Sequence, residues 1–476
     1  MDVFVEIFQV FVNKFLAQPA LLLGTIVFIG YLLMGKKFYQ AFSGFIKAYV
    51  GYAILQVGTS GLVGNFSPVI EALRNKFGIS AYVIDPYFGQ TSAQMVLEGV
   101  NSLQYVGYVM LIAFFVNIFL VFFQKQTKIR SLFLTGHIMY QQSAVILWAF
   151  YWILHTVTGE PVGIPLVILT GLFTGVYWSV FSNLIIEATN DVTDGAGFTI
   201  GHQQMLGAWV AYKVGKVIGN KEHSTENIEM PGFMSIFKDN IVSNVVIMTV
   251  FIGIIMIICG PESFEYNTKS YTWATYIFFV GASFAVNITI ILTGVRIFVG
   301  ELTESFNGIS SKLLKGSIPA VDCAVTFGFA PNTPAYGFIM GFIGQLLAIS
   351  LLLIFKSPIL ILSGFICLFF DNGTIAIYAN KAGGRRAATI IPFCCGLLQV
   401  FGSALVLTLL GNSDLVIGWM GMFDWVTFMP VVLFGTKYIG AAMIVITIAA
   451  MLVVPQLQYK RKKDTYFNTM RYEDEA

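Results

Sequence analysis

Histidine and glutamine occur together at two places in a chain that is otherwise strongly apolar. The stretch TGHIMYQQ places His137 four residues before Gln141, and the stretch IGHQQ places His202 directly before Gln203. Residues four apart on a helix point to one face, so His137 and Gln141 offer several hydrogen-bond donors and acceptors to the same side. These side chains are suited to binding a polar molecule through directional hydrogen bonds.

Two interpretations of these polar groups remain open. Polar side chains at membrane depth cost free energy unless they are paired, and hydrogen bonds between neighbouring helices would satisfy them. The second stretch, however, follows GAGFTIG, which has three glycines in seven residues. Irregular backbone at membrane depth is tolerated where it is buried in protein or lines a wet cavity, and its free N–H groups could bind an anion or hydroxyls. Two such stretches in one chain favour a shared polar pocket.

Asp322 lies in the segment IPAVDCAVTFGFAPNTP, whose prolines and glycine indicate a broken, partly re-entrant helix. A carboxylate within a membrane segment is a candidate functional group, and the alternative is that it caps the half-helix that follows. Asp85 occupies a similar place before Pro86, where a cap is the expected role. Asp371, in FFDNGT, is expected to be a turn residue.

The side chains that these segments offer fit a small polyhydroxylated molecule better than an inorganic ion or a lipid. Tyr87 could cover one face of a ring. Neither an HxxxH motif nor a carboxylate–histidine cluster occurs along the sequence, so we expect no metal and no other cofactor. His155 and His223 are assigned to interface and solvent positions.

Motifs for enzymatic chemistry are missing from the sequence. It has no P-loop, no kinase motif and no nucleophile elbow, so we expect no catalytic residues. If phosphoryl transfer energises the protein, another polypeptide must supply it.

The elements that must position these residues are membrane helices. Of the 476 residues 57% are hydrophobic and only 11% are charged, against about 25% charged in a soluble domain. A membrane span needs roughly 20 apolar residues, and about eleven segments qualify. We therefore predict an all-α polytopic membrane protein. The net charge of +2 favours no charged partner, and we expect no nucleic acid.

The order of features is similar in the two halves of the chain. Spans near 41–61 and 271–299 each precede an amphipathic stretch, at 66–78 and 300–316, which we predict to be a separate surface helix. YVIDPY then resembles PAVDCA, and FLTGHIM resembles ILSGFIC. This order indicates an internal structural repeat.

Loop charges indicate that the repeat is inverted. QKQTKIR has three basic residues and its counterpart KSP has one, whereas HTVTGEPVG has none and its counterpart NKAGGRRAA has three. Because Lys and Arg mark the cytoplasmic side, equivalent loops would face opposite sides of the membrane. The basic tail QYKRKK places the carboxyl terminus in the cytoplasm and, with an odd number of spans, the amino terminus outside. Inverted repeats are typical of alternating-access transporters.

Five strings resemble a known family: TGHIMYQQ, DVTDGAGFTIGHQQ, ELTESFNGIS, AVDCA and FAPN. They closely resemble the ascorbate-specific permease subunits (enzyme IIC) of the bacterial phosphotransferase system, from PALLLG near residue 19 to GMFDW near residue 421. The resemblance implies a homodimer in the bacterial inner membrane with eleven spans per protomer. It also implies a V-shaped motif at the dimer interface and a core domain that holds L-ascorbate and moves as a rigid body. Enzyme IIB, with its phosphoryl group supplied by enzyme IIA, would phosphorylate the arriving sugar acid.

The resemblance also implies a set of substrate-binding residues and a division of the chain. The residues are His137, Gln141, His202, Gln203, Asp322, Tyr87 and Thr59. The expected parts are V-motif spans at 1–64 and 236–299, core-domain segments at 65–235 and 300–428, and the last span with the basic tail at 429–476. An alternative function is an ion-coupled secondary transporter of another hydroxylated carboxylate, in which Asp322 and the two histidines relay protons.

Overall fold

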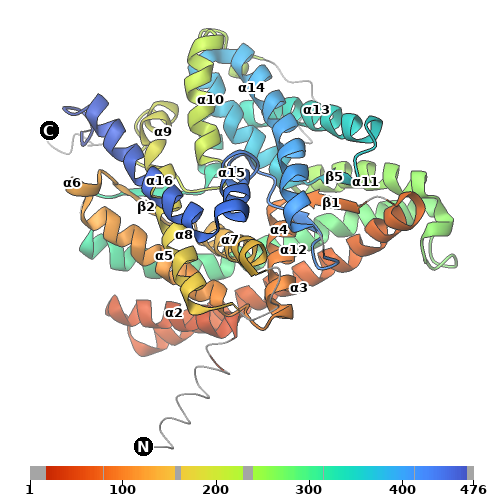
Figure 1. The fold of residues 1–476 in the computed structure, drawn as a ribbon, viewed down its shortest axis with the longest axis horizontal. Helices are drawn as coiled ribbons and strands as arrows, with labels where there is room; N and C mark the ends of the chain where they lie inside the picture. The colour runs from red at the N-terminus through yellow and green to blue at the C-terminus, as the bar shows by residue number, and fades with distance from the viewer. Residues whose placement is uncertain are drawn as a thin grey trace, which may run out of the picture.

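Helices make up most of the computed structural model, which describes residues 15, 18–78, 80–155, 162–228, 240–314, 316–411 and 413–468 (Figure 1). Within this part of the chain, seven helices are long and apolar enough to cross a membrane, and the helices at 23–33 and 248–259 are apolar but shorter. The predicted polytopic helical fold is confirmed. The count of eleven spans and the orientation of the repeat stay predictions.

Each half of the chain contributes two helices to a first group of four. They are α2 (Pro19–Leu33), α3 (Phe38–Phe77), α11 (Asn240–Cys259) and α12 (Trp273–Leu313). The prediction of a separate surface helix after the span is wrong in both halves, because α3 and α12 each continue through the predicted boundary. Pro68 lies inside α3 without ending it. The buried side chains of Phe66, Val69 and Leu73 continue the packed face of the helix and hold it together beyond the span.

Glycine allows α3 and α12 to cross at backbone contact. A Cβ atom on Gly51 would lie 2.6 Å from the amide nitrogen of Phe298, and one on Gly294 would lie 2.5 Å from the carbonyl oxygen of Gly51. Real Cβ atoms do not approach so closely, so these positions accept only glycine without a shift of the helices. Small residues at such crossings let membrane helices pack by close backbone approach.

The remaining helices belong to the segments that carry the polar motifs. In the first half they are α4 (Pro86–Gly99), α5 (Tyr105–Phe122), α6 (Gln124–Thr127), α7 (Gly136–His155), α8 (Ile164–Leu184), α9 (Ile186–Val192) and α10 (Met205–Ile218). In the second half they are the 3-10 helix η5 (Cys323–Phe329), α13 (Thr333–Ile354), the π-helical turn η6 (Cys367–Asp371), α14 (Asn372–Leu410), α15 (Phe423–Ile439) and α16 (Ala441–Arg461). A loop was predicted at NKAGGRRAA. The structure has instead a kink within α14 at Gly384, whose φ is 62°.

Six short strands, which the sequence analysis did not predict, form two parallel sheets. The first sheet has the order β5 (Ile359–Ser363), β1 (Ser80–Ile84), β6 (Gly418–Trp419), and the second has the order β2 (Ser131–Phe133), β4 (Ile318–Val321), β3 (Thr199–Ile200). The central strand of each sheet comes from one half of the chain and both outer strands come from the other half. The two halves are therefore joined by backbone hydrogen bonds as well as by helix packing.

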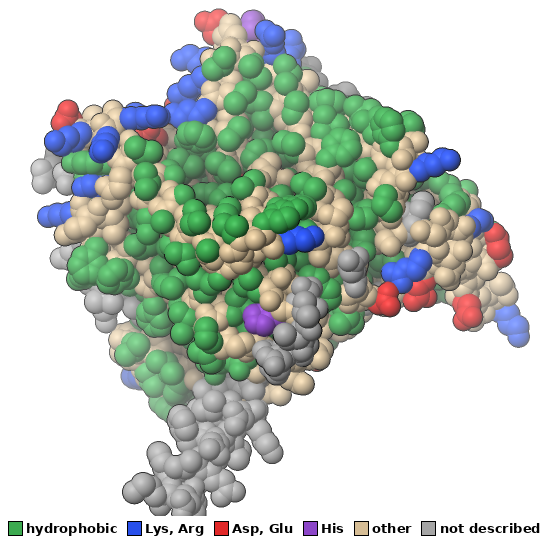
Figure 2. Space-filling model, viewed as in Figure 1, with side chains coloured by type: hydrophobic (Ala, Val, Ile, Leu, Met, Phe, Trp, Pro, Cys, Tyr) green, Lys and Arg blue, Asp and Glu red, His purple; other side chains and the backbone are tan. Residues whose placement is uncertain are grey.

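The surface combines an apolar band with a basic rim. Figure 2 shows apolar side chains over most of the visible face, and Lys and Arg gathered at the top and upper left, where Figure 1 draws α10 and the end of α16. One arginine, Arg130, is covered by another segment of the chain and does not belong to this surface. The guanidinium of Arg130 lies 4.3 Å from the ring centroid of Tyr466 and donates to its carbonyl oxygen, so Arg130 is buried beneath the segment after α16.

Candidate functional site

The second sheet explains why the predicted polar residues meet. Strands β2, β4 and β3 are parallel, so their carboxyl ends lie at one edge of the sheet. His137 follows β2 by four residues, His202 follows β3 by two, and Asp322 follows β4 directly. Ligand sites in open parallel sheets form at this edge for the same reason. Three side chains that are far apart in the sequence thus share one location.

His137, His202 and Asp322 form a compact cluster at this edge. Nε2 of His137 lies 3.4 Å from Oδ2 of Asp322, and the ring centroids of His137 and His202 are 6.1 Å apart. One nitrogen or oxygen atom from each residue lies within 4.8 Å of the other two. The expectation that the chain has no carboxylate–histidine cluster is therefore wrong, because the sheet assembles one that no local motif reveals.

Asp322 caps the helix that follows it and also faces the polar cluster. Its Oδ1 atom accepts a hydrogen bond of 2.9 Å from the amide of Ala324 and so caps η5. Its Oδ2 atom is the one that faces His137. The cap fixes the carboxylate and leaves one oxygen directed toward the imidazoles.

Gln141 and Gln203 form a buried amide pair beside the cluster. Nε2 of Gln203 donates to Oε1 of Gln141 over 2.8 Å. The remaining amide groups, Nε2 of Gln141 and Oε1 of Gln203, are buried and have no hydrogen-bond partner among the described residues. Because an unpaired buried polar group costs about 1–3 kcal/mol, the pair presents one donor and one acceptor that a ligand would satisfy.

The second glutamine of each doublet positions the site, a role that the sequence analysis missed. Gln142 donates to the carbonyl oxygen of His202 over 3.3 Å and accepts from Nε1 of Trp178 over 2.6 Å. Gln204 contacts Nδ1 of His202 through its Oε1 over 2.7 Å. The glutamine doublets could have indicated this role, since neighbouring residues point in different directions. One glutamine of each doublet faces the cluster and the other contacts the residues that hold it.

Tyr87 and Thr59 are the two predicted site residues that come from elements other than the strand ends of the second sheet and α7. Tyr87 is buried at the start of α4, after the first sheet, and its side chain lies within electrostatic range of Asp322. Thr59 lies on α3, and its side chain is outside the described residues. Asp85 caps α4 through the amide of Tyr87, as predicted.

The interpretation of Asp371 as a turn residue is wrong. It is the last residue of η6, directly before α14, and its side chain is fully buried. Oδ2 of Asp371 accepts hydrogen bonds from Nε2 of Gln399 over 2.5 Å and from the amide of Phe423 over 2.9 Å. The turn signal of FFDNGT fails because these buried donors hold Oδ2 within continuous helical structure, while Oδ1 is buried without a hydrogen-bond partner among the described residues.

Comparisons with known proteins show the family of this chain. A family model described as "PTS system sugar-specific permease component" matches residues 14–431. A relative in Mycoplasma pneumoniae, named "Ascorbate-specific PTS system EIIC component", is 36% identical over 451 residues, which cover 85% of this chain and 67% of the relative.

The chain belongs to the family of PTS sugar-specific permease components. This permease component is thus a multi-pass membrane protein that transports a sugar substrate together with other proteins of the phosphotransferase system. The family predicted from the sequence motifs is confirmed. Its role as a transport component, rather than an enzyme, follows from the same matches.

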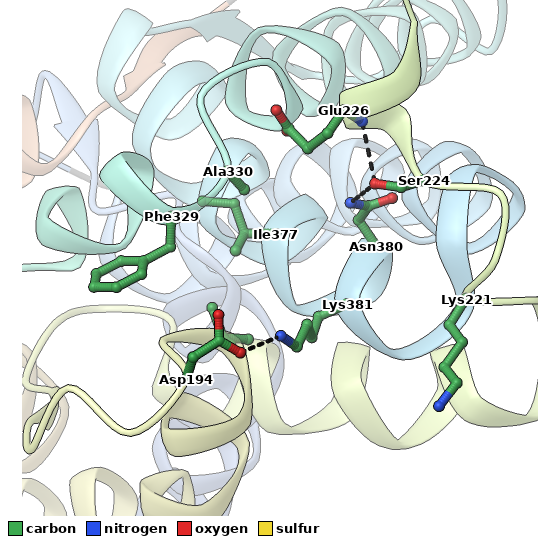
Figure 3. A pocket seen from close by; sticks show the side chains of 10 residues that line it. Asp194, Lys221, Ser224, Glu226, Phe329, Ala330, Ile377, Asn380 and Lys381 are labelled. Carbon is green, nitrogen blue, oxygen red and sulfur yellow. Dashed lines mark hydrogen bonds and ion pairs between the residues drawn. The ribbon is translucent and has the colours of Figure 1, made fainter.

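A cavity of about 270 Å³ lies at the ends of the segments that begin in the site (Figure 3). It is bounded by Phe329 at the end of η5, which starts after Asp322, and by Asp194 in the connection that leads to β3 and His202. Lys381 of α14 forms an ion pair of 2.8 Å with Asp194 across it. Among the described residues, none of the predicted site residues lines this cavity, which is linked to the polar cluster only along the chain, through η5 and the connection to β3.

Proposed function

We propose that this permease component carries L-ascorbate and binds it with His137, Gln141, His202, Gln203 and Asp322. The observation that carries the proposal is the pair of unpartnered amide groups on Gln141 and Gln203, next to the histidines. A hydroxylated ring would satisfy both groups. The name of the relative in Mycoplasma pneumoniae supports ascorbate as that ring.

The chemistry of the site suits a small, planar, hydroxylated monoanion. Neutral imidazoles and amides form hydrogen bonds with such a ring without burying a full positive charge. The amino-terminal end of α7, where His137 is the second residue, adds free backbone N–H groups and a favourable dipole. Asp322 then accepts a hydrogen bond from a hydroxyl group of the sugar acid. Tyr87 and Thr59 complete the proposed pocket from the other side.

The proposed transport cycle follows from the family. Helices α2, α3, α11 and α12 would form the V-motif and the dimer interface of a homodimer in the bacterial inner membrane, with the boundaries 1–64 and 236–299. The core segments 65–235 and 300–428 would move as a rigid body. Enzyme IIB, with its phosphoryl group supplied by enzyme IIA, would phosphorylate ascorbate on the cytoplasmic side. The basic rim at the end of α16 supports a cytoplasmic carboxyl terminus and an external amino terminus.

Binding of labelled L-ascorbate to the purified protein tests the proposed site. We expect His137→Ala and His202→Ala each to weaken binding about tenfold, since each removes a hydrogen bond worth roughly 0.5–1.5 kcal/mol and leaves its partner unpaired, and about 1.4 kcal/mol is a factor of ten. His223→Ala is the matched control, because His223 is exposed in the loop after α10. Unchanged affinity in both site variants would show that ascorbate binds elsewhere or is not the substrate.

Uptake by membrane vesicles separates this function from ion-coupled transport. Phosphotransferase transport requires the soluble phosphoryl carriers and yields a phosphorylated product inside the vesicle. Uptake of unmodified ascorbate driven by a pH gradient alone would favour the secondary transporter instead.

A further inference from the structure

We propose that His137, His202 and Asp322 also form a binding site for Zn²⁺, and that the ion and the sugar acid exclude each other. Zinc binding itself depends only on the cluster, whereas the exclusion rests on the proposed function. Two histidines and one carboxylate are a ligand set that Zn²⁺ accepts in proteins, with the fourth position left open to water.

The spacing of the ligand atoms fits a tetrahedral ion. With bonds of about 2.0–2.1 Å, two ligand atoms of a tetrahedral zinc site are separated by about 3.4 Å. Nε2 of His137 and Oδ2 of Asp322 are 3.4 Å apart. The ligand atom of His202 lies within 4.8 Å of both, so a small shift of its imidazole that keeps the contact with Gln204 would complete the site.

The contacts of His202 fix the tautomer that zinc requires. Oε1 of Gln204 accepts a hydrogen bond from the backbone amide of Gln203, which identifies this atom as an acceptor. Nδ1 of His202, 2.7 Å from the same oxygen, must therefore carry the proton. Nε2 of His202 is left with a free lone pair. A metal-binding histidine is typically held in this way, by a hydrogen bond from its other nitrogen.

The other two ligands are accessible, and Asp322 is also held in place. Oδ1 of Asp322 is engaged by the amide of Ala324, so Oδ2 is the oxygen available to an ion. The side chains of His137 and Asp322 are 17% and 36% exposed, so an ion could reach them. Bound Zn²⁺ would take the lone pairs that the proposed hydrogen bonds to a sugar acid need. One set of atoms cannot serve both ligands at once.

Calorimetric titration of the full-length protein, with any histidine tag removed, tests zinc binding in the absence of ascorbate. We expect saturable binding of about one Zn²⁺ per chain and no comparable binding of Mg²⁺, which prefers oxygen ligands. His137→Ala and Asp322→Asn should lose this binding, and His223→Ala should keep it. Zn²⁺ should also raise the melting temperature of the wild type and of His223→Ala, but not of the two site variants, whose melting curves without zinc report that they are folded.

Labelled ascorbate binding at increasing Zn²⁺ tests the exclusion. At a zinc concentration ten times its dissociation constant, competition predicts an apparent ascorbate affinity about elevenfold weaker. Absence of saturable zinc binding, or equal binding by wild type and both site variants, would overturn the zinc site. Zinc that leaves ascorbate affinity unchanged, or increases it, would overturn the exclusion. Failure of ascorbate to bind in the absence of zinc would instead count against the proposed function.

Discussion

Gln141 and Gln203 each use one polar atom of the side-chain amide to bind the other, and each has a second polar atom left without a partner among the described residues. Elsewhere in the protein, Gln345 donates to Oε1 of Gln399 over 2.6 Å and accepts from the hydroxyl of Ser363. That second pair is fully engaged by protein groups. The two pairs are alike in type and burial, and they differ in whether a polar group remains for a ligand.

The contrast between the two glutamine pairs leads to a prediction. Gln203→Leu should weaken ascorbate binding about tenfold or more, because it removes an acceptor for the ligand and unpairs Gln141, at a cost of about 1–3 kcal/mol. Gln345→Leu is the matched control and should lower the melting temperature while ascorbate affinity stays within about twofold. Both are measured by ligand binding and thermal unfolding. Equal losses of affinity would mean that the two pairs have the same structural role.

At this scale the sequence predicted which residue types form the site but not how they are arranged. His137, His202 and Asp322 were predicted as candidates because polar groups are costly in an apolar chain. A shared pocket was predicted for them, but the sheet that brings them together was not, since its strands give no signal of their own. The supporting roles of Gln142 and Gln204 were also missed, because sequence alone does not tell which of two adjacent glutamines faces a pocket.

Among the elements, α3 and α12 are held together by a glycine crossing that tolerates little change. We expect Gly51→Ala to destabilise the protein by roughly 1–3 kcal/mol, the usual cost of an overpacked contact, because the added Cβ would meet the backbone of α12. This appears as a lower melting temperature.

Gly64 on the same helix supplies the control for this substitution. A Cβ atom at Gly64 would have no described atom within 4 Å. Gly64→Ala should therefore be neutral or stabilising by up to about 1 kcal/mol, through helix propensity. If the two alanine variants melt alike, the crossing does not depend on close backbone contact.

The helices themselves were predicted well because long apolar runs leave little choice of structure. Their ends were predicted less well. In α3 the polar, charged stretch after the span indicated a separate surface helix, yet buried Phe66 and Leu73 keep the helix continuous through Pro68. Tertiary packing, which the sequence does not display, decided the boundary.

The whole molecule is built so that neither half contains a complete sheet. Strand β1 of the first half pairs with β5 and β6 of the second, and β4 of the second half pairs with β2 and β3 of the first. The strands are two to five residues long and their partners lie far away in the chain. Such strands show no periodicity, which is why the sequence did not predict them.

Division of the chain tests this dependence. We expect residues 1–234 and 235–476, produced separately, not to bind ascorbate, since each would leave strands unpaired and the first would lack Asp322. Production of both pieces together should restore binding, measured with labelled ligand on the copurified pair. Binding by the first piece alone would show that the site does not need β4 and its carboxylate.

The pairing of strands between the halves also delays the completion of each sheet during biosynthesis. The paired residues Ile84 and Ser363 are 363 − 84 = 279 residues apart. At about 5–20 residues per second of translation, β1 waits roughly 15–55 s for its partner β5 to be made. During this time its backbone N–H and C=O groups need other partners, because unpaired groups are costly in lipid. The nascent chain must therefore be sheltered, by the insertion machinery or by water, until its second half arrives.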